Sequence, residues 1–141
     1  MYKVKILSVG KHKEPWLQEA LDLYTARLKG QMGLEWTLVK DDAHLNELLL
    51  KEKAFICLSP EGKQFTSESF ASFLQEALLK GGSRLSFAIG GADGFSKAVK
   101  EKAGLLISLS PLTFTHQITR LILLEQLYRA LEIHKGSSYH K

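Results

Sequence analysis

Five short runs rich in strand-forming residues alternate with segments of helical spacing, and this alternation constrains the fold more than any other feature of the chain. The strand runs cover residues 2–9, 34–39, 54–58, 85–89 and 105–109. The later runs are apolar throughout, which is typical of strands covered on both faces of a sheet. The pattern therefore predicts an α/β domain with a parallel sheet and helices on both faces.

Residues that begin or end helices separate these runs. Pro15 suits the first turn of a helix that places Trp16 on the same apolar face as Leu17 and Leu21. The later helices have candidate caps with side-chain oxygens, namely Asp41 or Asp42, Thr66 or Ser67, Ser96, and Thr115. We expect the five helices to end near residues 28, 52, 80, 103 and 133.

The last predicted helix is apolar around a whole turn, because residues 121–124 read LILL. A helix in a domain of this size normally has one apolar stripe and one polar face. The pattern therefore predicts that a second chain covers part of this helix, with a polar site where the two chains meet.

Length and composition indicate a single domain over residues 1–141. Such a chain buries roughly two-thirds of its unfolded surface. No apolar run approaches the roughly 20 residues that span a bilayer, so we expect no membrane segment. The formal net charge of +4 leaves open whether the basic residues serve solubility or a polyanionic partner.

The cysteine and histidine content favours a cytoplasmic protein without a metal site. Cys57, the single cysteine, excludes an internal disulfide and suits a reducing compartment. It lies inside an apolar strand run, which favours a core position over a nucleophile. The five histidines show no spacing typical of metal ligands.

Ligands of parallel sheets collect beyond the carboxyl ends of the strands, and three turns qualify: residues 59–62, 90–94 and 110–115. The turn at 90–94 reads GGADG, which does not match the spacing of a dinucleotide-binding loop. A structural turn with positive φ and a cradle for a phosphate or adenosine both stay open there.

The turn at 110–115 carries more information. Leu112 and Phe114 can contact a flat ring, while Ser110 and Thr113 offer hydroxyl groups. The alternative is a simple connection in which Thr115 caps the last helix.

Polar residues gather on the last helix and in the tail. His116 and Arg120 are four residues apart and share a helix face, although His116 can be a cap and Arg120 can pair with a carboxylate. Glu125 and Arg129 have the spacing of an ion pair. The terminal residues 139–141, YHK, can stack on and grip a nucleotide, or they can form a frayed end.

Several longer motifs point to a known family. The chain contains LSPEGK at 58–63, IGGADG at 89–94, SLSPLTFTHQ at 108–117 and the terminal YHK. Together they resemble the bacterial 23S rRNA pseudouridine-N3 methyltransferases of the SPOUT class over nearly the whole length. The resemblance implies a C-terminal trefoil knot, a homodimer, and S-adenosylmethionine as methyl donor. The implied substrate is a pseudouridine in the helix 69 loop of large-subunit rRNA, on the assembled ribosome. The methyl donor contacts carried over by position are Leu58, Gly90, Leu109, Ser110, Pro111, Leu112, Thr113 and Phe114.

The substrate-handling residues are a hypothesis from residue chemistry. Tyr139 and His140 of one subunit are expected to meet the pocket of the other, with Arg120 or Arg129 holding a phosphate or the base. The chain departs from the family pattern at Thr115, where proline is usual, and in a shortened stretch at 40–53. Two rival functions stay open: a small dehydrogenase, and a ribosome-binding factor that has lost activity.

Overall fold

Five parallel strands form the sheet of the computed structural model, which describes residues 1–140. The elements in chain order are β1 (Tyr2–Val9), α1 (Pro15–Leu28), β2 (Met32–Val39), α2 (Asp42–Leu49), β3 (Ile56–Gln64), α3 (Ser67–Lys80), β4 (Arg84–Ile89), α4 (Lys97–Lys102), β5 (Leu105–Ser108) and α5 (His116–Lys135). The strand order is β2-β1-β4-β3-β5, and each neighbouring pair is parallel. The predicted α/β architecture is confirmed.

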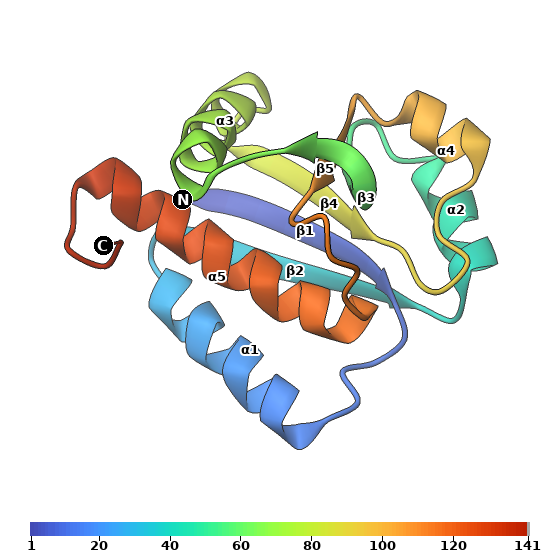
Figure 1. Ribbon diagram of the computed structural model, residues 1–141, viewed down its shortest axis with the longest axis horizontal. Coiled ribbons are helices and arrows are strands. Elements are labelled where there is room, and N and C mark those ends of the chain that lie inside the picture. Colours follow the sequence, from blue (N-terminus) through green and yellow to red (C-terminus); the bar gives the residue numbers. More distant parts are fainter. Residues whose placement is uncertain (141) are drawn as a thin grey trace.

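Helices cover both faces of the sheet (Figure 1). On one face α1, α3 and α5 pack over a core that contains Ile6, and on the other α2 and α4 pack over a core that contains Leu7. These two neighbouring side chains are both 0% exposed, because successive residues of a strand point to opposite faces. Cys57 belongs to the second core, where burial raises the pKa of its thiol to about 12. Its predicted core position is confirmed.

The chain itself covers most of the apolar turn in α5. This helix lies between α1 and α3 and packs against both (Figure 1). Leu123 and Leu124 are fully buried, while Leu121 and Ile122 stay partly exposed. The apolar pattern by itself therefore does not require a second chain, and the homodimer stays a prediction.

Strand β3 differs from its prediction in length. It continues to Gln64, so the turn expected at residues 59–62 is wrong. Leu58 and Lys63 both pair with Ile107 of β5, and the residues between them bulge out of the ladder. A bulge is where a strand inside a sheet tolerates a proline, and Pro60 lies in this one.

Four helices begin at side-chain caps among the predicted candidates, at Asp41, Thr66, Ser96 and Thr115. The prediction for one side chain of α1 is wrong: Trp16, expected on the apolar face, is 52% exposed. None of the helices within residues 1–140 is both long and apolar enough to cross a membrane. Over the same residues, no group of three or more His, Cys, Asp or Glu side chains could hold a metal ion.

Candidate functional site

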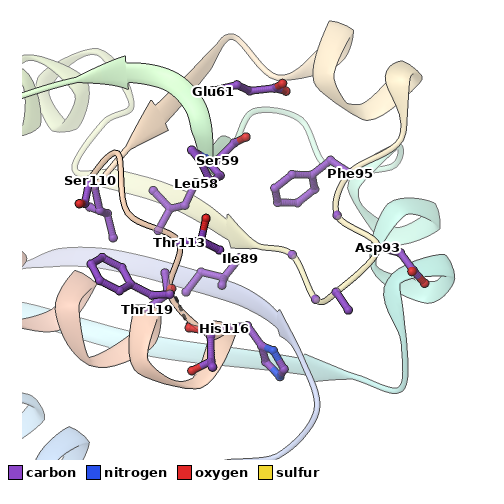
Figure 2. Close-up of a pocket in the computed structure, with 18 of the residues that line it drawn as sticks. Leu58, Ser59, Glu61, Ile89, Asp93, Phe95, Ser110, Thr113, His116 and Thr119 are labelled. Atoms are coloured by element: carbon purple, nitrogen blue, oxygen red, sulfur yellow. Dashed lines mark hydrogen bonds between the residues drawn. The ribbon is translucent and has the colours of Figure 1, made fainter.

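A cavity of about 700 Å³ lies beyond the carboxyl ends of β3, β4 and β5 (Figure 2). Its walls come from the β3 bulge, from the turn after β4 at residues 90–95, and from the loop between β5 and α5 at residues 109–115. His116 and Thr119 of α5 and Lys100 of α4 complete the lining. This volume is within the usual range for small-molecule and cofactor sites.

Asp42, at the start of α2, holds the glycine-rich turn in place. Its Oδ1 accepts a hydrogen bond from the backbone N–H of Gly91 at 2.7 Å, and its Oδ2 accepts one from Asp93 at 3.0 Å. A Cβ at Gly91 would lie 2.9 Å from that carboxylate, so a larger residue there would push the Asp42 side chain away from the turn. Asp41 caps the helix, whereas Asp42 supports the cavity wall, a role that the sequence analysis missed.

Asn46, one turn further along α2, fixes the other end of this turn. Its side chain donates to the carbonyl of Gly94 at 3.3 Å and accepts from the backbone N–H of Ser96 at 2.8 Å. Gly94 has φ +69°, a conformation that glycine adopts without strain. The turn is therefore held in one shape by contacts from a helix about 50 residues earlier in the chain.

The loop between β5 and α5 is stabilised by its own hydroxyl groups. Ser108 Oγ donates to the carbonyl of Ser110 at 2.8 Å, and Ser110 Oγ accepts from the backbone N–H of Leu112 at 3.0 Å. Thr115 accepts from the backbone N–H of Ile118 at 3.2 Å, which confirms it as the cap of α5. The side chain of Leu112 is left 70% exposed at the cavity.

Three ionisable side chains besides that of His116 line the cavity: Glu61, Asp93 and Lys100. Lys100 Nζ lies 2.6 Å from Glu61 Oε1, so the two form an ion pair between α4 and the β3 bulge. Burial, with the nearby charges of Arg120 and Lys13, lowers the pKa of His116 from its usual value. This shift favours the neutral imidazole of His116 at pH 7.

Arg120 does not reach this cavity, although the sequence spacing places it near His116. Its side chain is 0% exposed and donates to the hydroxyl of Ser8 and to the carbonyls of Val9 at 2.6 Å and Gly10 at 2.8 Å. Its Nη1 also donates to Nδ1 of His12 at 3.0 Å. Burial lowers the pKa of Arg120 to about 10, which leaves it protonated at neutral pH. It holds the end of β1 from within the core, and a role of Arg120 in holding the substrate stays a prediction.

The tail folds back onto the far end of α5 (Figure 1). The Tyr139 hydroxyl donates to Glu125 Oε2 at 2.8 Å, and Arg129 donates to the same carboxylate at 2.8 Å. Arg129 also donates from Nη1 to Nδ1 of His140 at 2.8 Å. The structure thus brings three predicted substrate-handling residues together around Glu125, whereas the last residue of the motif, Lys141, lies outside the described residues.

Charge and aromatic contacts also stabilise this group of Glu125, Arg129, Tyr139 and His140, which we call the tail cluster. Burial acts to raise the pKa of Glu125, but hydrogen bonds from Arg129 and Tyr139 lower it overall. The Arg129 guanidinium carbon lies 4.9 Å from the centre of the Tyr139 ring. Tyr139 also meets Tyr128 edge-on, with ring centres 4.8 Å apart. Glu125 and Arg129 of this cluster lie ~14 and ~20 Å beyond His116, the first residue of α5, at a helical rise of ~1.5 Å per residue.

Comparison with known proteins decides the family. A family model described as "Predicted SPOUT methyltransferase" matches residues 2–140. The chain belongs to the SPOUT methyltransferase family. Among similar proteins, one from Protochlamydia amoebophila is 53% identical over 141 residues, covering 100% of both chains. One from Prochlorococcus marinus is 44% identical, covering 99% of this chain and 96% of the relative. Both are named "Ribosomal RNA large subunit methyltransferase H".

Family membership makes this chain a methyltransferase and overturns the dehydrogenase alternative. The parallel sheet with helices on both faces is consistent with the SPOUT fold, and the trefoil knot stays a prediction. SPOUT methyltransferases use a methyl donor, and the cavity is the candidate site for it. Of the residues expected to contact the donor, all except Pro111 line the cavity: Leu58, Gly90, Leu109, Ser110, Leu112, Thr113 and Phe114.

Sequence reasoning missed some of the lining. Phe95 directly follows the glycine turn, and Figure 2 shows its ring directed into the cavity. Thr119 lies one helical turn after His116, so the i,i+3 spacing was a usable signal. Lys100 had no such signal, because its place depends on how α4 packs beside β3.

Proposed function

We propose that this methyltransferase transfers a methyl group from S-adenosylmethionine to N3 of a pseudouridine in the helix 69 loop of 23S rRNA, on the assembled ribosome. The observation that carries the proposal is the convergence of the three segments that the family resemblance implies for the methyl donor on one cavity. The names of the similar proteins, which specify large-subunit ribosomal RNA, support the choice of substrate.

The residues of the cavity fit this methyl donor. Leu58, Ile89 and Leu109 supply apolar surface for a purine ring. Glycine at position 90 lets the turn stay compact, since a Cβ there would lie 3.3 Å from Gly94 Cα and 3.5 Å from the Phe95 ring. When bound, S-adenosylmethionine supplies an electrophilic methyl group on its sulfonium sulfur. The protein binds and orients this donor, since alignment of the methyl group with the attacking nitrogen contributes much of the rate.

We further propose a homodimer in which the tail cluster of one subunit serves the cavity of the other. Tyr139, His140 and Arg129 would contact the RNA there, because none of the three lines the cavity of their own chain. A group near the reacting base assists by accepting the N3 proton or by stabilising the anionic base. Arg120 would act only as a positioning residue.

Exposed apolar side chains support the dimer. Trp16 and Leu23 are seven residues apart on α1 and are 52% and 49% exposed, while Ile118 of α5 is 39% exposed. Replacing both Trp16 and Leu23 with glutamate should convert a dimer to a monomer in sedimentation velocity, because charges would replace buried apolar contacts. Leu79→Glu is the matched control, since Leu79 is 83% exposed on α3. A wild-type protein that sediments as a monomer at micromolar concentration would contradict the dimer.

The decisive test of the reaction is transfer of labelled methyl from S-adenosylmethionine. The acceptors are ribosomes, large subunits and naked 23S rRNA, each lacking the modification. We expect label at the helix 69 pseudouridine in ribosomes. Ribosome binding without any transfer would instead favour the inactive RNA-binding factor, and label at another nucleotide would refute the proposed substrate.

His140→Ala should lower the rate of methyl transfer about 100-fold while S-adenosylmethionine binding stays within about twofold. The imidazole is proposed to act on the RNA base and not on the methyl donor. His134→Ala is the control, since His134 is exposed in the last turn of α5. Single-turnover rates and calorimetry measure the two effects, and unchanged turnover in His140→Ala would refute the role.

Asp42→Ala should weaken S-adenosylmethionine binding about 10-fold, because the glycine-rich turn loses two hydrogen bonds that hold its shape. Asp41→Ala removes the cap of the same helix without touching that turn. It should lower stability modestly, as the loss of a helix cap does, with little change in binding. If both variants weakened binding equally, the stability of α2 as a whole, and not the Asp42 contacts, would account for the loss of binding.

A further inference from the structure

The charged groups of the cavity are concentrated in the ion pair between Glu61 and Lys100. Figure 2 shows Glu61 at the rim, directed toward α4, whereas Asp93 is directed away from the cavity. Lys100 extends from α4 to meet Glu61 at 2.6 Å. Most of the remaining lining is apolar or carries hydroxyl groups, and the lowered pKa of His116 favours its neutral form. A ligand with charges of both signs therefore finds its complements at this rim.

The ion pair can exchange partners at low cost. The side chains of Lys100 and Glu61 are 37% and 56% exposed, and ion pairs so accessible to water contribute little to stability. An ammonium group entering the cavity can take the place of Lys100 beside Glu61, and a carboxylate can take the place of Glu61 beside Lys100. A ligand that carries both groups on one carbon satisfies both side chains and leaves no charge unpaired.

We propose that Glu61 and Lys100 form the subsite for the α-amino acid end of S-adenosylmethionine, an assignment that rests on the proposed function. The ammonium group pairs with Glu61 and the carboxylate with Lys100, while the adenosine contacts the apolar walls around Leu58 and Ile89. The side chains come from the β3 bulge and from α4, so the subsite exists only because these two elements meet at the rim.

Two adenosine thioethers separate this subsite from the rest of the cavity. S-Adenosylhomocysteine carries the amino acid end, and 5′-methylthioadenosine lacks it, while both have an uncharged sulfur. Calorimetry would compare their binding, and that of S-adenosylmethionine, to wild-type protein and to Glu61→Gln and Lys100→Met. The control is Lys102→Met, because Lys102 lies on the same helix but donates to the carbonyl of Leu50 and does not line the cavity.

We expect each variant to bind S-adenosylhomocysteine and S-adenosylmethionine about 10-fold more weakly, as the loss of one charge-assisted contact at a half-exposed site implies. Binding of 5′-methylthioadenosine should stay within about twofold, and Lys102→Met should resemble wild type. Equal losses for the two thioethers would show that the ion pair only braces the cavity, and unchanged binding of both would also overturn the subsite. Wild-type protein that binds none of the three ligands would refute the proposed methyl donor itself.

Discussion

Arg120→Ala should lower the free energy of unfolding by about 3–4 kcal/mol, the largest loss that we expect from a single substitution in this protein. The guanidinium is 0% exposed and satisfies the hydroxyl of Ser8 and the carbonyls of Val9 and Gly10. Alanine leaves these groups without their partner and leaves a cavity beneath α5. Burial of the guanidinium charge is unfavourable and lowers the pKa of Arg120 to about 10. Alanine removes this unfavourable burial, which offsets part of the loss.

Urea unfolding followed by circular dichroism, at one protein concentration, measures the change. Arg120→Lys should recover only part of the stability, because one ammonium group cannot reproduce the forked contacts. Arg84→Ala is the control, since Arg84 is an exposed arginine at the start of β4, and it should change stability by less than about 0.5 kcal/mol. A loss below about 1 kcal/mol for Arg120→Ala would show that the buried contacts contribute little.

Gly62→Ala should cost about 3 kcal/mol and also weaken binding of the methyl donor. A Cβ at this position would lie 2.5 Å from the carbonyl carbon of Leu106 and 2.6 Å from the backbone nitrogen of Ile107. Backbone atoms inside a sheet cannot rotate away, so β3 and β5 must separate. Because β5 leads directly into the loop at 109–115, the displacement would reach the wall of the cavity.

Gly104→Ala provides a matched control, because a Cβ there meets no atom within 4 Å. It should leave stability within about 0.5 kcal/mol of wild type. Urea unfolding and calorimetry with S-adenosylmethionine report the two effects of Gly62→Ala. Wild-type stability in that variant would mean that the bulge can shift without disturbing β5.

Features that depend on neighbours in sequence were predictable. Strand and helix periodicity placed the elements, and Asp41, Thr66, Ser96 and Thr115 were all among the predicted caps. Each of these depends on a hydrogen bond or a burial pattern within a few residues. The loops of the cavity were also found, because parallel strands place their carboxyl ends at one edge of the sheet.

Features that depend on distant contacts were not predictable in the same way. Trp16 has the spacing of an apolar helix face, yet no other element within residues 1–140 covers it fully. The residues at 59–62 have the composition of a turn, but β5 pairs with the chain on both sides of them and makes them a bulge. The i,i+4 spacing of His116 and Arg120 gave no sign that Arg120 enters the core.

The sequence by itself determined that this chain is an α/β protein with ligand-binding loops at residues 90–94 and 110–115, and its motifs identified the family. The tertiary structure alone decided that Asp42 supports the glycine turn, that Glu61 meets Lys100 and that Arg120 is buried. It also decided that Tyr139 and His140 gather with Glu125 and Arg129 of α5 and do not line the cavity of their own chain. The physical reason is that periodicity and capping are set within a turn of helix or a strand. Pairings between residues 39 to 110 positions apart are set by the packing of whole elements.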